Sequence, residues 1–373
     1  MTARSRGEPP RLLRVATIGD GILLCPFFST LDAREVRRVC RVLHAAVTKY
    51  RWPNCVLSGQ GRDRFAGVKA SFPLLDSLRV VNVRASENEA VVAADDLKLP
   101  AALTRLEFND VYFAPGAALA IASLARLRRL DIYDVELAGG AGPFVLDLSL
   151  LAGCRQLQAL SCNVSGDQLT LLAGLPIIEL TARAFPEAAI FGDRQVDSLL
   201  GLESLTLAGN FEFMAAPASF ARSFNQLREL KLRIFEAGLF TAAHLRALKL
   251  SKLSINGCEG VEVTNEWFAA LTDTEDISLR GIDIVFTHET PQYLSNMASL
   301  HLEHVRLTDE SMGHFRNVTA LVLKRCDLRG LTGAGLRKPP LRYLRTDDQR
   351  VFRQACRVLP HATVSYGEDS DED

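Results

Sequence analysis

The chain has 373 residues, of which 48% are hydrophobic and 23% are charged, and its formal net charge is −1 at pH 7. It contains no unbroken apolar stretch of 18 or more residues, so we expect no membrane-spanning helix. Its eight cysteines include no Cys-x-x-Cys pair, and several occupy apolar positions of the repeat described below. We therefore interpret them as buried small hydrophobic residues in a chain of the reducing cytoplasm or nucleus.

The N-terminal part differs from the rest of the chain. Residues 1–17 are expected to be disordered, and residues 1–14 carry arginines and prolines before any apolar run, which is not a signal-peptide pattern. Residues 18–57 predict a small helical module. Within it Val36, Val39, Leu43 and Val47 recur at helical spacing among arginines, which predicts an amphipathic helix with an arginine-rich outer face.

This module resembles an F-box, the short helical domain that docks onto the adaptor subunit of cullin-RING ubiquitin ligases. The matching residues are Leu23-Leu24, Phe27-Phe28, Leu31, Glu35-Val36 and Val39-Cys40-Arg41. The chain departs from the family where Ile18-Gly19-Asp20 replaces Leu-Pro and where Leu43 takes the position of a Trp. The resemblance implies that the adaptor-binding residues are Phe27, Phe28, Leu31 and Val36. A helical cap on the first repeat, without adaptor binding, would show the same amphipathic helix and stays open, as does an unrelated module.

Between residues 75 and 346 the pattern Leu-x-x-Leu-x-Leu recurs at intervals that cluster near 24 residues. The middle apolar residues of its twelve copies are Leu78, Leu106, Leu130, Leu160, Ile178, Leu205, Leu230, Leu253, Ile277, Leu300, Leu321 and Leu344. The steps between them run from 18 to 30 residues, in or near the range typical of a leucine-rich repeat.

Each copy predicts a short strand whose leucines point to one side while the residues between them point to the other. One strand cannot bury its apolar row alone, but stacked strands form a continuous core under a parallel sheet. We therefore predict an α/β leucine-rich-repeat solenoid of about twelve repeats over residues 58–366, with a curved parallel sheet and a helical N-terminal module.

The residues after the strands indicate the repeat subclass. After the strand ending at Ile255 come Cys258 and then Thr264-Asn265-Glu266, and after the strand ending at Leu302 comes Thr308-Asp309-Glu310. These segments resemble the cysteine-containing type of leucine-rich repeat, although only Asn210, Cys258 and Cys326 hold a Cys or Asn at its characteristic position. An F-box directly before such repeats is the domain order of F-box/leucine-rich-repeat proteins, which are ubiquitin-ligase substrate receptors.

Catalytic readings have little support in the sequence. His301 and Glu303 share one face of a strand and His314 lies one helix away, but solvated side chains on a repeat explain them without a metal. The glycine cluster at 139–142 lacks the Lys-Ser/Thr of a phosphate-binding loop, and no nucleophile motif is present. We expect no enzymatic activity, no metal and no cofactor.

Binding is expected on the open face of the sheet. The residues between the paired core positions are Arg79, Glu107, Asp131, Ser161, Glu179, Thr206, Lys231, Ser254, Ser278, His301, Val322 and Arg345. The first half leans acidic, and the later half is more basic, which favours an acidic or phosphorylated partner there. The predicted partner-binding residues are Tyr133, Lys231, Arg233, Arg280, His301 and Lys324.

Residues 367–373 form an acidic tail with five acids around Ser370. This composition predicts disorder. Ser370, with an acid three positions later, resembles a target of acidophilic kinases, while a purely solubilising tail is the alternative reading. Without the tail the formal net charge changes from −1 to +4.

The resulting hypothesis is a non-enzymatic substrate receptor of a cullin-RING ubiquitin ligase, with the adaptor on residues 18–57 and an unknown protein substrate on the concave sheet. The alternative is a leucine-rich-repeat interaction scaffold whose N-terminal helices serve only as a cap. Neither a nucleic acid nor a membrane is expected as a partner.

Overall fold

The computed structural model describes residues 17–18, 21–23, 54–58, 75–83, 99–113, 119–137, 143–233, 240–257, 262–284, 287 and 289–367. The chain divides into two units. The first comprises Met1–Phe144 and Leu150–Leu157, and the second comprises Val145–Ser149 and Gln158–Asp373. The short helix η3, Leu148–Gly153, contributes residues to both.

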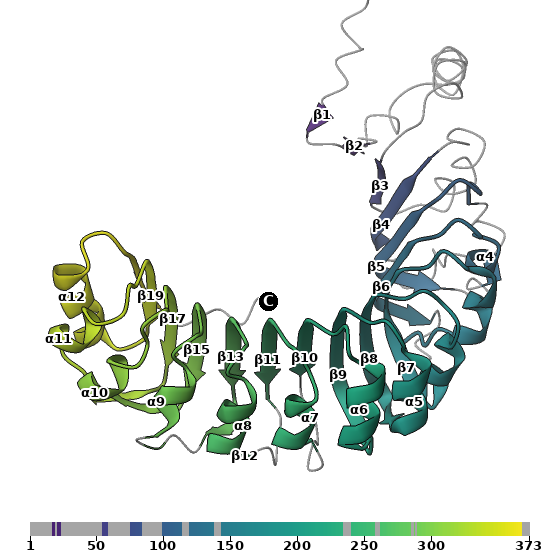
Figure 1. The fold of residues 1–373 in the computed structure, drawn as a ribbon. Helices are drawn as coiled ribbons and strands as arrows, with labels where there is room; N and C mark the ends of the chain where they lie inside the picture. The colour runs from purple at the N-terminus through teal and green to yellow at the C-terminus, as the bar shows by residue number, and fades with distance from the viewer. Residues whose placement is uncertain are drawn as a thin grey trace, which may run out of the picture. The chain divides into compact units, whose positions relative to one another are not determined.

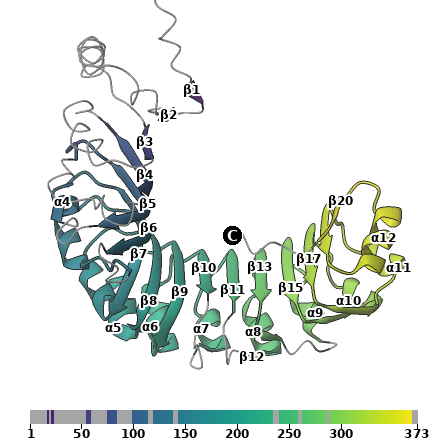
Figure 2. The ribbon, with the colours of Figure 1, turned by 180° about the vertical axis from the view of Figure 1, so that it is seen from behind.

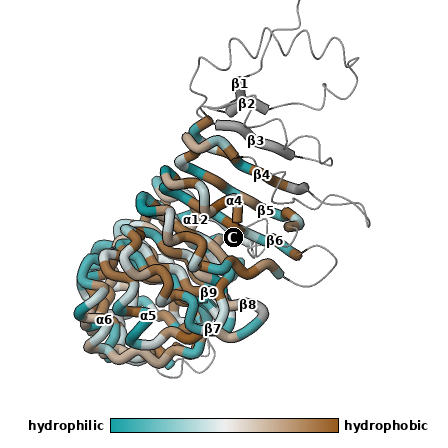
Figure 3. The backbone as a smooth tube through the Cα atoms, turned by 90° about the vertical axis from the view of Figure 1, so that its right-hand side faces the viewer, coloured by the Kyte–Doolittle hydropathy of each residue, from teal (hydrophilic) through white to brown (hydrophobic). Residues whose placement is uncertain are grey.

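Strands dominate the described part of the first unit (Figure 1). Its elements are β1 (Thr17–Ile18), β2 (Gly21–Leu23), β3 (Asn54–Ser58), β4 (Ser77–Val83), β5 (Arg105–Phe113), α4 (Leu119–Ala122) and β6 (Arg129–Leu137). Strands β1 and β2 are antiparallel, whereas β2 to β6 pair in parallel in chain order. Leu78, Leu106 and Leu130 are in register and fully buried, as the repeat predicts. Hydrophobic and hydrophilic stretches follow one another along β4, β5 and β6 in Figure 3.

The N-terminal module is described only in part. Strand β2 and residues 54–57 of β3 lie within residues 18–57, where the sequence predicts helices, and β3 pairs in parallel with β4. Leu57 of β3 stands beside Val80 of β4, so the strand pairing begins before residue 58. The predicted amphipathic helix and the four adaptor-binding residues Phe27, Phe28, Leu31 and Val36 lie outside the described residues.

The second unit repeats a strand followed by a short helix (Figures 1 and 2). Its elements are β7 (Ala159–Gly166), η4 (Gln168–Leu172), β8 (Glu179–Phe191), α5 (Asp193–Ser198), β9 (Ser204–Phe213), α6 (Pro217–Ser223), β10 (Glu229–Arg233), α7 (Ala242–Arg246), β11 (Lys252–Asn256), β12 (Glu262–Val263), α8 (Asn265–Ala270), β13 (Asp276–Arg280), β14 (Asp283–Ile284), α9 (Thr290–Tyr293), β15 (Ser299–Glu303), β16 (Arg306–Thr308), α10 (Asp309–Met312), β17 (Ala320–Lys324), β18 (Asp327–Gly330), α11 (Gly333–Leu336), β19 (Tyr343–Thr346), α12 (Gln349–Val358) and β20 (Thr363–Tyr366). The long strands are neighbours in the order β7-β8-β9-β10-β11-β13-β15-β17-β19-β20, and β12 pairs with β14 and β16 with β18. Within this unit the sheet curves with its strands on the inner side and the helices α5 to α12 on the outer side.

The repeat leucines stack in register. Leu205, Leu230, Leu253, Ile277, Leu300 and Leu321 pair one with the next across parallel strands, and none is more than 2% exposed. Burying a leucine side chain contributes roughly 1.5–3 kcal/mol, so the row stabilises the stack of strands that it lies beneath. The prediction of a leucine-rich-repeat solenoid is confirmed.

One repeat has a different register from the one predicted. Strand β8 places Leu180, not Ile178, beside Leu160 and Leu205, so Thr181 rather than Glu179 stands between its core positions. Ile178 is half-buried. The second core position holds Ala182. Because alanine is small, this strand does not show the Leu-x-Leu pattern of the other repeats at its core positions.

A left-handed residue ends the strand in four successive repeats. Gly257, Gly281, His304 and Arg325 follow directly after β11, β13, β15 and β17 and have φ between 50° and 66°. Glycine adopts this conformation freely, whereas His304 and Arg325 do so at a cost of about 1–2 kcal/mol each. Because the backbone turns at the same position in each repeat, the strands end along a common edge of the sheet.

The position after this turn is the one that defines the cysteine-containing repeat type. Val305 and Ile282 are buried there, Cys326 is half-buried, and Asn210 is exposed, while Cys258 lies outside the described residues. The Cys326 thiol donates a hydrogen bond to the carbonyl oxygen of Lys324 at 3.1 Å. Burial raises the pKa of this thiol to about 11.

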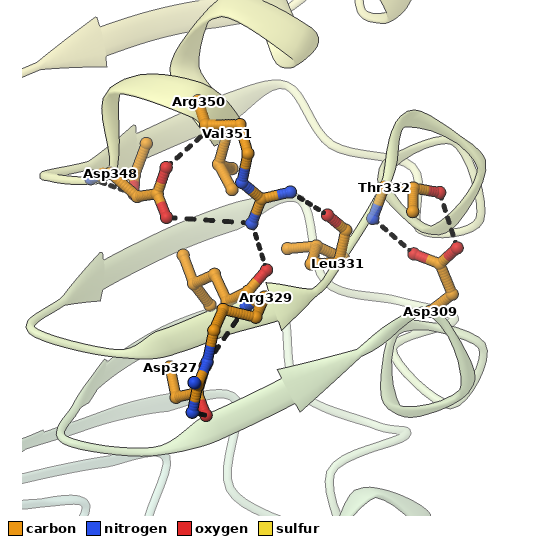
Figure 4. Close-up of polar contacts among 10 residues, drawn as sticks. Asp309, Asp327, Arg329, Leu331, Thr332, Asp348, Arg350 and Val351 are labelled. Atoms are coloured by element: carbon orange, nitrogen blue, oxygen red, sulfur yellow. Dashed lines mark hydrogen bonds and ion pairs between the residues drawn. The ribbon is translucent and has the colours of Figure 1, made fainter.

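Side chains join the last repeats on the helical side (Figure 4). The Asp309 carboxylate accepts hydrogen bonds from the backbone N and the hydroxyl of Thr332, at 2.7 and 2.6 Å. Asp348 caps α12 by accepting from the backbone N of Val351 at 2.9 Å, and the Arg350 guanidinium donates to the Leu331 carbonyl at 2.9 Å. These contacts satisfy backbone groups at helix ends and in connecting loops.

Candidate functional site

The strand face is defined here as the side of the second unit's sheet that points away from the helices. Its middle row consists of the residues between the two core positions of each strand, namely Ser161, Thr181, Thr206, Lys231, Ser254, Ser278, His301, Val322, Arg345 and Ser365. Adjacent members are one strand apart, roughly 4.8 Å.

Three of the predicted partner-binding residues come together on β13, β15 and β17. The Arg280 Nε donates to His301 Nδ1 at 3.0 Å, and the Lys324 Nζ lies 3.8 Å from Glu303 Oε1. His301 Nε2 lies 3.9 Å from the same Glu303 oxygen. We refer to Arg280, His301, Glu303 and Lys324 as the β13–β17 cluster.

A backbone hydrogen bond holds Glu303 of the cluster in place. Glu303 Oε2 accepts a hydrogen bond at 3.0 Å from the backbone N of Gly281, the left-handed residue after β13. His301 and Glu303 are only 6% and 9% exposed. Because His301 Nδ1 accepts from a guanidinium, a neutral ring carries its hydrogen on Nε2, which faces Glu303. When the ring is neutral, the cluster contains two cations, Arg280 and Lys324, and one carboxylate, that of Glu303.

Glu303 was absent from the predicted partner-binding residues. It lies two positions after His301, so strand periodicity alone puts both side chains on one face. What the sequence does not reveal is that the neighbouring turn N–H donates to Glu303 and fixes its carboxylate between His301 and Lys324.

Lys231 and Arg233 lie on the same face but outside the cluster. Lys231 is in register with Ser254, Ser278 and His301, which separates it from His301 by three strand spacings, about 14 Å. Its Nζ forms an ion pair with Glu229 Oε1 at 3.0 Å. Burial raises the pKa of Glu229, but the hydrogen bond and charge of Lys231 outweigh it, so the pKa is lowered overall. Lys231 is thus partly neutralised by its own strand.

Tyr133, the sixth predicted residue, belongs to the first unit. Its hydroxyl donates to Asp131 Oδ1 at 3.5 Å, and Arg129 Nε donates to Asp131 Oδ2 at 2.8 Å. Arg105 lies 3.8 Å from Glu107 and 3.9 Å from Asp131. Arg105 and Arg129, two positions before Glu107 and Asp131 on the same strands, therefore offset the charge of these two acids.

Among the described residues no group of three or more His, Cys, Asp or Glu side chains is placed to hold a metal ion. No helix within the described ranges has the length and apolarity to cross a membrane. The free cysteines Cys154 and Cys162 are buried, and burial raises the pKa of the Cys162 thiol to about 12.

Comparisons with known proteins yield structural similarities alone. No family model matches the sequence, and no curated protein matches it. The chain is similar to the crystal structure of a TLR13–ssRNA13 complex (14% identity, 88% of this chain and 59% of that chain, TM-score 0.44). It is also similar to the mouse RP105/MD-1 complex (13% identity, 75% of this chain and 60% of that chain, TM-score 0.42). A third similar structure is an internalin, inlF, from Listeria monocytogenes (13% identity, 89% of this chain and 95% of that chain, TM-score 0.43).

The chain covers less than two thirds of the length of the first two of these structures. At these identities and TM-scores the similarities assign no family, ligand or partner to it.

Proposed function

We propose that the strand face of the second unit binds a protein partner, with the β13–β17 cluster inside the contact area. The observation that carries this proposal is the cluster itself: Arg280, His301, Glu303 and Lys324 are joined across three strands and point away from the core. Side chains already held in place lose little conformational entropy when a partner binds, which favours affinity.

The dimensions of the surface suit a protein rather than a small molecule. Ten strands at roughly 4.8 Å spacing span about 43 Å along the sheet. A standard protein interface needs about 800 Å² on each partner, which a face of this width can supply. Because the cluster has one more cation than it has anions when His301 is neutral, we propose that an acidic surface of the partner faces it.

The test is partner recovery with matched variants of the full chain. Arg280→Glu combined with Lys324→Glu reverses two charges on the strand face, and Arg246→Glu reverses a half-exposed charge on α7 of the helical side. Proteins cross-linked to the wild type should be lost from the double variant and kept by Arg246→Glu. Equal recovery with all three proteins would refute binding through this face.

The finer proposal is a substrate receptor of a cullin-RING ubiquitin ligase. It is supported by the resemblance of residues 18–57 to an F-box and by their position before the repeats. Purified adaptor subunit should bind the full chain, and Phe27→Ala with Phe28→Ala should abolish this binding without affecting partner recovery. Absence of adaptor binding by the wild type would leave the alternative, an interaction scaffold with an N-terminal cap.

A further inference from the structure

The middle row contains one apolar residue. In the ten strands that the second unit contributes to the large sheet, every member of this row is polar except Val322 on β17. The residue two positions earlier on the same strand and the same face is Ala320. Both are half-buried, so they reach the surface of a row whose other members are hydrophilic. Neither side chain belongs to the buried core, whose positions on this strand are Leu321 and Leu323.

An aromatic residue and a cation stand beside these two residues. Ala320 is in register with Tyr343 on β19, and Val322 is in register with Arg345. Tyr343 and Arg345 are also half-buried, and the Tyr343 hydroxyl lies 3.4 Å from the Ser365 hydroxyl on β20. Ala320, Val322, Tyr343 and Arg345 together form what we call the β17–β19 patch. Tyr and Arg are the residue types enriched among those that carry most of the binding energy at interfaces.

We infer that the β17–β19 patch anchors an acidic peptide segment of the partner by receiving one apolar side chain on Ala320 and Val322. This inference rests on the proposed function and specifies which part of the strand face holds the partner most strongly. The patch spans two strands, roughly 5 Å across and 7 Å along β17, which is the size of one side chain. Its apolar centre beside Tyr343 and Arg345 follows the usual arrangement of an apolar interface core with a polar surround.

Charge identifies the chemical class of the segment. Residues 320–367 contain ten Lys and Arg against three Asp and Glu, a net charge of +7 in a chain whose total is −1. All three acids are engaged: Asp327 with Arg329 at 2.9 Å, Asp347 with the backbone N of Arg325 at 2.6 Å, and Asp348 with the backbone N of Val351.

Of the ten cations, Lys324 is already paired with Glu303 of the preceding repeat, and the other nine still outnumber the three acids. Arg329 and Arg350 are used within the fold, as Figure 4 shows. Arg325, directly after β17, and Arg342, directly before β19, are exposed. A segment that carries carboxylates on either side of its apolar residue would be attracted to this part of the chain, whereas a basic segment would be repelled.

The test uses the full chain and three labelled decapeptides of defined composition. One is acidic with a central Leu, one has the same acids with a central Ser, and one is basic with a central Leu. Measured by fluorescence polarisation, the acidic Leu peptide should bind the wild type about fivefold more tightly than the acidic Ser peptide, which corresponds to partial burial of one leucine. The basic peptide should show no binding.

Variants separate the apolar contribution from the charge contribution. Val322→Ser should abolish the preference for Leu over Ser, and the isosteric Val322→Thr should reduce it, while both retain binding of the acidic Ser peptide. Arg345→Gln should weaken both acidic peptides equally. Thr206→Ala, at the equivalent position of β9, should change nothing. Thermal unfolding of each variant establishes that it is folded.

Several outcomes would overturn the inference. Equal binding of the Leu and Ser peptides by the wild type, no binding of any peptide, or a Leu preference that survives Val322→Ser would each do so. The proposed function fails separately: it falls when partner recovery is insensitive to Arg280→Glu with Lys324→Glu. Recovery that depends on those two residues but not on Val322 would preserve the function and refute the anchor.

Discussion

Lowering the pH from 7 to 5 should destabilise the second unit through His244. This residue lies on α7, is 3% exposed, and packs against the rings of Phe213, Phe220 and Phe240. Its Nδ1 accepts a hydrogen bond from the backbone N of Thr241 at 3.1 Å, and its Nε2 lies 2.9 Å from the Ala215 carbonyl oxygen. An imidazolium carries a hydrogen on both nitrogens and could not accept from Thr241, so the folded state requires the neutral ring.

The magnitude follows from proton linkage. Burial lowers the pKa of His244 from its ordinary value of 6.5, and the hydrogen bond to the Ala215 carbonyl only partly offsets this. A lowered folded-state pKa means that the unfolded state binds the proton first. The contribution of neutral His244 to the free energy of unfolding is therefore fully present above pH 7. Below pH 6.5 it decreases by up to about 1.4 kcal/mol per pH unit, until the pH reaches the pKa of His244 in the folded state. Between 6.5 and 5 the loss attributable to this residue is at most about 2 kcal/mol.

The comparison variant is His244→Gln. Glutamine is a natural acceptor at the third helical position and can keep the bond from the Thr241 backbone N without titrating. The variant loses ring packing, so its urea midpoint at pH 8 should lie below that of the wild type. Between pH 7 and 5 its midpoint should fall less than the wild-type midpoint, because the other histidines titrate in both proteins. Parallel curves would show that His244 is not held neutral.

Three further predictions concern the fold. Gly209→Ala should destabilise by more than about 2 kcal/mol, because φ is 87° and an added Cβ would lie 2.3 Å from a carbonyl oxygen; Gly174→Ala, at φ 83° with nothing within 4 Å, should cost about half as much in the same urea titration. Leu300→Ala removes a side chain that is 1% exposed and should lower the unfolding free energy by about 2–5 kcal/mol, and a smaller change would contradict the stacked core. Among the described thiols, exposed Cys356 should react with an alkylating reagent in the native protein while Cys162 reacts only after unfolding, as peptide mass spectrometry would reveal.

The repeat made the fold predictable because its period carries physical information. Leucines at alternating positions must lie on one side of a strand, and a near-constant step must bring them into register. The same reasoning failed at β8, where Ala182 fills a core position that was expected to hold a large residue. It also missed β20, where Val364 lies beside Leu344 but the second core position holds Tyr366, which is exposed.

The candidate site was predictable only one strand at a time. Periodicity placed Arg280, His301 and Lys324 on the open face, and the register then brought them together. The ion pairs were not predicted from the sequence. Periodicity puts Lys231 and Glu229 on the same face of β10, but it does not show that their side chains form an ion pair. Val322 carries no charge, and its apolar character stands out only against the polarity of the other members of its row, which the strand register aligns.

The distribution of charge between neighbouring strands explains why the two units should differ as binding surfaces. In the first unit cations and acids alternate at short range, since Arg79 pairs with Glu107 at 2.7 Å and Arg129 with Asp131 at 2.8 Å. The acids of these pairs are largely neutralised, so a partner would have to break an existing pair before forming its own with the same arginines. Residues 320–367 instead contain ten Lys and Arg against three Asp and Glu. An acidic partner would therefore meet a net positive charge on the last repeats, whereas at the described residues of β4 to β6 it would compete with existing ion pairs.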